Sequence, residues 1–192
     1  MKYRTTLGAL ALAVGLVSTA HAADFVEGKD YKVLPNPETI AGDVVVVREF
    51  FWYGCPHCLS REPHMQKWAK TRAKDVKFFR TPAVMNTVWE VPARGFYAAQ
   101  LMGFEEKTHQ ALFDTIHKDN KRVDKSQQTL ADWYATQGVD KAKFGSLYNS
   151  FAVTTKIERA KQGARRYQLT GVPAVVVHGK YVVQGEGEEV AH

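Results

Sequence analysis

The chain has 192 residues, of which 45% are hydrophobic, and a formal net charge of +6. This size and composition suffice to bury one core with an insertion, so we expect a globular protein and not a disordered one. The positive charge is modest, and the densest basic stretch, Lys118 to Lys125, is diluted by Asp119 and Asp124, which argues against a nucleic-acid-binding surface.

Residues 1–22 have the three parts of a secretion signal. A basic start at Met1 to Arg4 is followed by an apolar run from Leu7 to Val17 and by the small-x-small pattern Ala20-His21-Ala22, so we expect cleavage after Ala22. The apolar run is shorter than the roughly 20 residues that a membrane span needs. Export, in a bacterium to the periplasm, places the protein where disulfides persist.

Two stretches before residue 52 have the character of strands. Tyr31 to Leu34 is predicted to form a short edge strand that ends at Pro35 and Pro37. Val44 to Phe51 begins with four valines and has the length of a strand that is buried on both faces. We expect this second stretch to be the central strand.

Cys55 and Cys58 are the only two cysteines, and they lie where the central strand gives way to a helical pattern. The unpaired N–H groups of a first helical turn and the helix dipole favour negative charge, so we expect a stabilised Cys55 thiolate. Pro56 suits the first helical position because it lacks the N–H group that this turn leaves unpaired. A closely spaced dithiol in this place indicates redox chemistry.

A zinc site and a structural disulfide are alternative interpretations of the cysteine pair. A structural zinc site needs four ligands, usually including a second cysteine pair or two closely spaced histidines, and the chain has no further cysteine. A disulfide that closes so short a loop adds little stability, because the effect grows with loop length. The redox interpretation is favoured, and we expect no metal and no separate cofactor.

The helix after the dithiol carries Pro63 in its interior. Proline there removes a hydrogen bond, so we expect a kink or a restart of the helix. Val76 to Arg80 is the next predicted strand. Because a helix-length crossover joins it to the central strand, the two strands should be parallel.

From Thr87 to Gln168 the apolar residues recur at three-and-four spacing, which predicts several helices with one buried face each. Ser126 and Asp140 occupy expected N-cap positions, and Gly103 and Gly138 expected helix ends. The residues that we interpret as the core of these helices are Phe96, Tyr97, Leu101, Leu112, Phe113, Ile116, Leu130, Trp133, Tyr134, Phe144, Leu147, Tyr148, Phe151, Ile157, Ala160 and Ala164.

Two short apolar runs follow Pro173. Ala174 to Val177 and Tyr181 to Val183 flank His178-Gly179-Lys180, a pattern that predicts a hairpin with glycine in the turn. The remaining residues, Gln184 to His192, carry no pattern of a further strand or helix.

The segment Glu49-Phe50-Phe51 followed by Cys55-Pro56-His57-Cys58 resembles the DsbA-type thiol:disulfide interchange proteins of the thioredoxin-like superfamily. Thr170-Gly171-Val172-Pro173 resembles the cis-proline loop of these proteins. The resemblance implies an α/β thioredoxin-like fold with an inserted helical subdomain, and the helix that usually ends the fold has no counterpart here, as in a truncated sequence. The implied division is a signal peptide (1–22), a first thioredoxin-like part (23–86), the inserted subdomain (87–168) and a second thioredoxin-like part (169–192).

The sulfur chemistry and the resemblance together assign a role in disulfide exchange to four residues. At the helix start, Cys55 should be the sulfur that a reduced exported polypeptide attacks, and Cys58 the buried resolving partner. The resemblance implies that His57 adds positive charge or a hydrogen bond to the thiolate. It also implies that Glu49 is buried with a raised pKa and relays a proton to or from Cys58. The histidines expected at the surface are His64, His109, His117 and His178.

The resemblance also implies a substrate groove. A cis Val172–Pro173 bond would bring Val172 beside Cys55 and leave its backbone free to pair with an extended peptide. An apolar surface near Trp52, Pro56 and Val172 would receive a DsbB-type membrane oxidase that restores the disulfide. We expect a periplasmic monomer.

Three functions are compatible with the sequence. The favoured one is a periplasmic dithiol oxidase. The second is a reductase or isomerase of the DsbC type, but such isomerases carry a dimerisation domain, and the few mature residues before Val44 leave no room for it. The third is a non-catalytic binder, either a peptide-holding chaperone or a copper carrier, although no methionine or histidine cluster supports a carrier.

Overall fold

The computed structural model describes residues 25–184. The expected signal sequence, residues 1–22, and the last segment, residues 185–192, lie outside the described residues. Within residues 25–184, no helix is long and apolar enough to cross a membrane.

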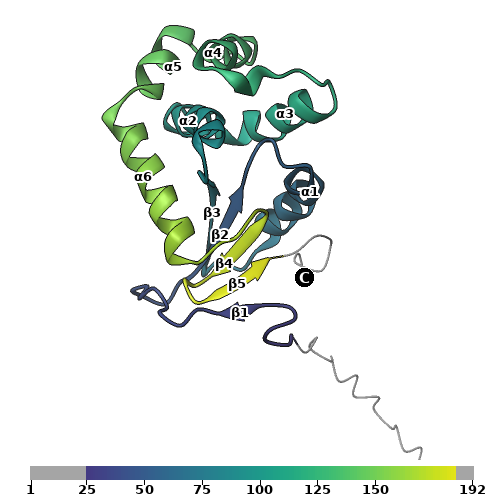
Figure 1. The fold of residues 1–192 in the computed structure, drawn as a ribbon, viewed down its shortest axis with the longest axis vertical. Helices are drawn as coiled ribbons and strands as arrows, with labels where there is room; N and C mark the ends of the chain where they lie inside the picture. Colours follow the sequence, from purple (N-terminus) through teal and green to yellow (C-terminus); the bar gives the residue numbers. More distant parts are fainter. Residues whose placement is uncertain (1–24, 185–192) are drawn as a thin grey trace, which may run out of the picture.

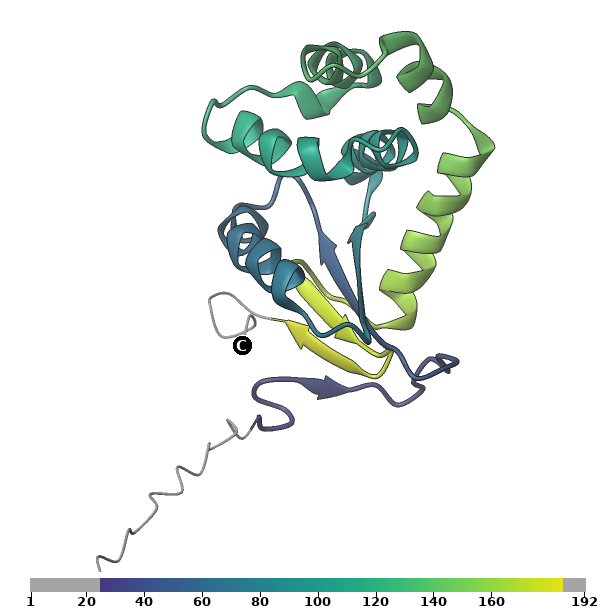
Figure 2. The same cartoon turned by 180° about the vertical axis from the view of Figure 1, so that it is seen from behind.

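In the described part of the chain, five strands form one mixed sheet in the order β1-β5-β4-β2-β3 (Figures 1 and 2). The central strand β2 (Val45–Phe51) lies parallel to β3 (Val76–Pro82) and antiparallel to β4 (Ala174–Val177). β4 forms a hairpin with β5 (Tyr181–Gln184), and β1 (Lys32–Val33) pairs with β5 at the edge. The predicted parallel pair, hairpin and edge strand are therefore confirmed.

The helices also follow the predicted pattern. After α1 (Pro56–Thr71), the chain between β3 and β4 is helical, with Ser126 and Asp140 capping α4 and α5 through their side chains. Gly103 and Gly138 follow α2 and α4 with φ of +77° and +90°, a conformation that glycine adopts without strain. The elements of this region are α2 (Thr87–Leu101), α3 (Glu105–His117), the short 3-10 helix η1 (Val123–Lys125), α4 (Gln127–Thr136), α5 (Lys141–Tyr148) and α6 (Phe151–Arg166).

Two of the predicted core residues, Leu101 and Phe151, are instead exposed, by 42% and 86% respectively. Both lie at the end of a helix, where the three-and-four pattern continues but no neighbouring element covers the side chain.

Pro63 lies inside α1, which continues without a break from Pro56 to Thr71, so the expected restart does not occur. Two residues later, Met65 is 3% exposed and packs with Val47 and Val175 of the sheet. This contact keeps the residues after Pro63 helical although the proline cannot donate its hydrogen bond.

Residues of β2 that point to opposite faces of the sheet pack against different helices. Val47 faces α1, whereas Phe50 packs with Ala164 and Tyr167 at the end of α6, so α1 and α6 cover opposite faces of the sheet (Figures 1 and 2). Phe51, at the end of β2, belongs to the largest core cluster, which is built mainly from α2 to α6. The end of β2, and with it the dithiol, therefore lies where the sheet meets the helices.

Candidate active site

Cys55 is the N-cap residue of α1, with Pro56 at the first helical position, as the sequence predicts. The backbone N–H of Cys58 donates to the Cys55 Sγ atom at 3.3 Å. This is the N-cap arrangement in which a side chain satisfies an N–H group of the first turn, here with sulfur as the acceptor. The Cys55 sulfur therefore lies at the positive end of the helix, where its thiolate form accepts a stronger hydrogen bond than its thiol form.

The surroundings of Cys55 lower its pKa to about 6. The hydrogen bond from the Cys58 thiol contributes most. Burial opposes it, and the backbone N–H groups of Cys58 and His57 and the charge of His57 add to the lowering. The thiolate is therefore the main form of Cys55 at neutral pH, and the charge of the exposed His57 makes the smallest of these contributions.

Cys58 has the opposite character. Burial, the hydrogen bond to Cys55 and the charge of Cys55 raise the pKa of Cys58 far above that of an ordinary thiol. Cys55 is 6% exposed and Cys58 only 1%, and no disulfide joins them in this structure. Because the thiolate is the nucleophile in disulfide exchange, these differences favour Cys55 over Cys58 as the reactive sulfur.

The loop before β4 lies against Cys55. The Val172–Pro173 bond is cis, as expected, and the backbone oxygen of Val172 lies 3.6 Å from the Cys55 Sγ atom. Pro173 is buried, and Val172 is half-buried between two of the core clusters. The fold thus brings together two segments that are 117 residues apart in the chain.

Trp52 lies beside this site and stacks on Trp89 from α2, with ring centroids 4.6 Å apart and planes 6° from parallel. A Cβ atom at Gly54 would lie 2.3 Å from the Trp52 ring. The glycine before the dithiol therefore makes room for the stacked indole, which forms an aromatic surface next to the two cysteines.

Glu49 lies on β2 and is 1% exposed, which agrees with the prediction that it is buried. The pKa of Glu49 is raised to about 8, first by burial and then by the neighbouring Glu62, against the opposing charges of Arg80 and Arg61. The charge of Glu49 also acts on Cys58 by raising the pKa of that thiol. A carboxyl group that titrates near neutral pH is thus electrostatically linked to the resolving cysteine.

A buried charge cluster lies at the helix that carries the dithiol and consists of Glu49, Glu62, Arg80 and His109. Of these four residues, the sequence identified only Glu49 as part of the site. The Arg80 guanidinium lies 3.0 Å from Glu62 and 3.8 Å from Glu49. It also reaches two glutamates of α3, Glu105 and Glu106. Burial alone would raise the pKa of Glu62, but bonds to His109 and the charge of Arg80 outweigh burial and lower it.

His109 corrects the prediction that the four unassigned histidines lie at the surface. It is 1% exposed, its Nε2 atom lies 3.2 Å from the Glu62 carboxylate, and its Nδ1 atom lies 2.9 Å from the Tyr53 hydroxyl. His109 shares a helix face with Leu112 and Phe113, a signal that could have placed it in the core. Of the others, only His64 is exposed, while His117 and His178 are half-buried.

Across residues 25–184, no group of three or more histidine, cysteine or acidic side chains is placed to hold a metal ion. The groups that bear on the two sulfurs are a helix terminus, buried charges and the backbone of the cis-proline loop. What this arrangement can do chemically is thiol–disulfide exchange.

Comparison with known proteins gives the same result. The family model described as DSBA-like thioredoxin domain matches residues 78–189. The thiol:disulfide interchange protein DsbA of Pseudomonas aeruginosa strain PAO1 is 43% identical over 90% of this chain and 82% of its own length. DsbA of Burkholderia cepacia is 41% identical over 92% of this chain and 84% of its own length.

Solved structures agree in fold. The crystal structure of P. aeruginosa DsbA matches with a TM-score of 0.80 at 42% identity, covering 85% of both chains. The oxidoreductase DsbA from Xylella fastidiosa matches with a TM-score of 0.80 at 33% identity, covering 86% of this chain and 91% of its own. From its sequence, its fold and its dithiol, we conclude that this chain belongs to the DsbA-like thioredoxin family and is a protein thiol:disulfide oxidoreductase that works through Cys55 and Cys58 without a separate cofactor.

Proposed function

We propose that the protein is an oxidase, which donates the Cys55–Cys58 disulfide to reduced polypeptides. The observation that carries this direction is the pKa of Cys55, which its surroundings lower to about 6. A stabilised thiolate stabilises the reduced form of the protein. Donating the disulfide is then favourable. In a reductase or isomerase, by contrast, the reduced form must be less strongly favoured over the oxidised form.

The proposed reaction has two exchange steps. A substrate thiolate attacks the Cys55 sulfur of the oxidised protein, the Cys55–Cys58 bond breaks, and Cys58 leaves with the electron pair and takes up a proton. The second substrate thiolate then attacks the substrate sulfur of the mixed disulfide, and Cys55 leaves as a thiolate. The substrate loses two electrons and gains a disulfide, and the protein becomes the dithiol.

The neighbours of the sulfurs have distinct proposed roles. Pro56 and the first turn of α1 hold the N–H groups on the Cys55 thiolate, and His57 adds positive charge. Glu49 supplies the proton that Cys58 takes up when it leaves, because its pKa of about 8 keeps the carboxyl group largely protonated at neutral pH.

We assign substrate binding to Val172, Pro173 and Trp52. The backbone of Val172 lies next to Cys55, where it can pair with an extended peptide whose cysteine is joined to that sulfur. The stacked Trp52 and Trp89 rings offer an apolar surface on the other segment of the site. Recognition through backbone and apolar contacts suits unfolded chains of varied sequence.

The cellular setting belongs to the same proposal. The protein acts in the bacterial periplasm, because residues 1–22 have the pattern of a secretion signal that would direct export, with cleavage after Ala22. The substrates are exported polypeptides with reduced cysteines, and a membrane oxidase of the DsbB type restores the disulfide. We propose that the protein acts as a monomer.

Titration of the reduced protein tests the lowered pKa of Cys55, on which the proposed oxidase activity rests. Thiolate absorbance in the ultraviolet should rise with a midpoint near pH 6 in the wild type. In Cys58→Ala the midpoint should move upward, because the Cys58 thiol makes the largest contribution to the lowering. It should stay below the value of about 8.5 for a free cysteine, because the backbone N–H groups remain.

Cys55→Ala is the matched control, and it should show no titration in this range because the pKa of Cys58 is raised. A wild-type midpoint near that of a free cysteine would remove the basis for the oxidase direction.

A further inference from the structure

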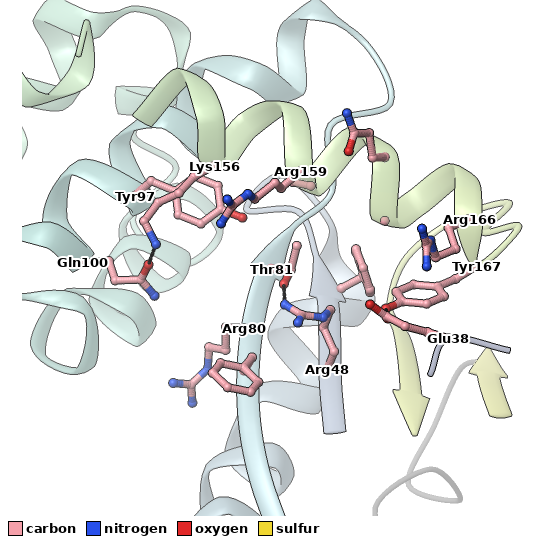
Figure 3. Close-up of a pocket in the computed structure, with 15 residues that line it drawn as sticks. Glu38, Arg48, Arg80, Thr81, Tyr97, Gln100, Lys156, Arg159, Arg166 and Tyr167 are labelled. Atoms are coloured by element: carbon pink, nitrogen blue, oxygen red, sulfur yellow. Dashed lines mark hydrogen bonds between the residues drawn. The ribbon is translucent and has the colours of Figure 1, made fainter. Parts of the chain in front are cut away.

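We propose that a cavity on the α6 face of the sheet, which we call the α6 cavity, binds a small organic polyanion that carries carboxylate or phosphate groups. The cavity has a volume of about 410 Å³ and lies between α6 and strands β2 and β3 (Figure 3). No residue from 52 to 58 lines it. It is therefore separate from the dithiol, which lies at the start of the helix covering the other face.

Cationic side chains dominate the lining. Arg48 comes from β2, and Lys156, Arg159 and Arg166 come from α6. Figure 3 shows the side chains of Arg48 and Arg166 on facing sides of the cavity, with Arg159 and Lys156 farther along α6. Glu38 is the single acidic residue among those that line the cavity, so cations outnumber carboxylates there.

Two further charged residues, Glu38 and Arg80, line the cavity. The Glu38 carboxylate accepts a hydrogen bond from the Tyr167 hydroxyl. Arg80 also contributes to the lining, but its guanidinium is bound to Glu62 and Glu106. The excess of positive charge in the cavity therefore comes from Arg48 and the three cations of α6, which face the single negative charge of Glu38.

Arg48 is the most informative of these residues because it is half-buried. Its guanidinium donates to the Thr81 hydroxyl at 3.0 Å and lies 5.2 Å from the centre of the Phe79 ring. Both partners are neutral, and within residues 25–184 no carboxylate forms an ion pair with Arg48, although Arg48 and the Glu38 carboxylate both interact with the Tyr167 hydroxyl. Removing a cation from water without a counter-charge costs free energy, which an anion in the cavity would recover.

The cations on α6 are arranged along one face. Lys156, Arg159, Gly163 and Arg166 follow three-and-four spacing, so their side chains lie above one another on the helix. Gly163 contributes no side chain, and a Cβ atom there would lie 3.3 Å from the Phe50 ring. Cations lined up in this way repel one another, and a bound anion relieves the repulsion.

The shape and chemistry of the cavity select the kind of ligand. Three of the four cations are arginines, whose planar guanidinium groups bind carboxylate and phosphate through paired hydrogen bonds. Phe50 and Phe79 add apolar surface. The volume falls in the range of small-molecule sites, so we assign a compact organic anion and not a folded partner.

Binding of citrate and of inorganic phosphate to the purified protein tests the proposal. At constant ionic strength, set with chloride, we expect each anion to raise the melting temperature in a saturable way, because a ligand that binds only the native state stabilises it. The double variant Arg159→Gln/Arg166→Gln should bind about tenfold or more weakly by calorimetry, because it loses two charged hydrogen-bond donors. Both residues are exposed, so the fold should persist.

Arg165→Gln is the matched control, because Arg165 is an exposed arginine of the same helix that does not line the cavity. It should bind like the wild type. Equal loss in both variants, a shift that chloride reproduces, or binding of a polyglutamate peptide but of neither small anion would overturn the proposal. The Cys55 titration should be unchanged in every variant, so failure here leaves the oxidase proposal untouched.

Discussion

The variant Cys58→Ser is expected to accumulate a mixed disulfide at Cys55, whereas Cys55→Ser is expected to form none. The test mixes each reduced variant with an unfolded protein whose single cysteine is capped by an aromatic thiol. The Cys55 thiolate attacks the substrate sulfur and releases the aromatic thiol, so one coloured leaving group appears for each adduct. In the wild type, Cys58 then displaces the substrate, and the adduct disappears.

The two variants should differ almost completely in adduct yield, because exposure and pKa both make Cys55 the more reactive of the two cysteines. Cys55 is the more exposed sulfur and has a pKa of about 6, while Cys58 is 1% exposed with a raised pKa. A non-reducing gel measures the adduct, and the variant with both cysteines replaced by serine serves as the background. Similar adduct yields from the two single variants would mean that attacker and resolver are wrongly assigned.

Arg80→Met is expected to lower the free energy of unfolding at neutral pH by about 3 to 5 kcal/mol, the usual cost of removing one partner from a buried ion pair. The Arg80 side chain is 4% exposed and lies 3.0 Å from Glu62 and 3.8 Å from Glu49, both buried. Methionine fills similar space but leaves these two carboxylates without their shared guanidinium. Denaturant unfolding of the oxidised protein measures the loss.

The pH dependence separates this cause from a simple packing defect. Without Arg80, the folded-state pKa of Glu62 should move from below to above the unfolded value of 4.5, and that of Glu49, already about 8, should rise further. A raised carboxyl pKa leaves stability intact below the unfolded pKa and removes it as pH rises through the folded pKa, so the deficit should grow from pH 4.5 towards pH 8.

Two variants complete this test. Adding Glu62→Gln to Arg80→Met should restore part of the loss, because the orphaned charge is then absent. Arg165→Met changes the charge equally at an exposed position and should have little effect. A deficit independent of pH, or one as small as that of Arg165→Met, would contradict an essential role for the buried pair.

Local patterns in the sequence were enough to predict most of the elements. Val45–Phe51 is recognisable because its valines and phenylalanines are interrupted only by Arg48 and Glu49, and Ser126 and Asp140 because caps depend only on neighbouring residues. The position of β4 between β2 and β5 depends on pairing across the whole helical region, which no local spacing reports. Only the resemblance to the family placed Val172 and Pro173 beside Cys55.

The buried charge cluster was missed for a different reason. Each of its residues has a polar side chain, and polar residues taken one at a time are read as surface. The signals were pairwise: Arg80 is opposite Glu49 in the β2–β3 register, and Glu62 comes four residues after Cys58 on the same helix. The first of these signals requires the register of the two strands. The division of the chain at residues 86 and 168 stays a prediction.

The claim that this dithiol acts as an oxidase is tested most directly by the reduction potential, measured from the equilibrium of the protein with reduced and oxidised glutathione. The stabilised Cys55 thiolate predicts a potential far above the value of about −270 mV for thioredoxin and towards about −120 mV, which is the reference value of DsbA itself and thus a property of that relative. A potential close to that of thioredoxin would contradict the account and assign the dithiol to reduction or isomerisation.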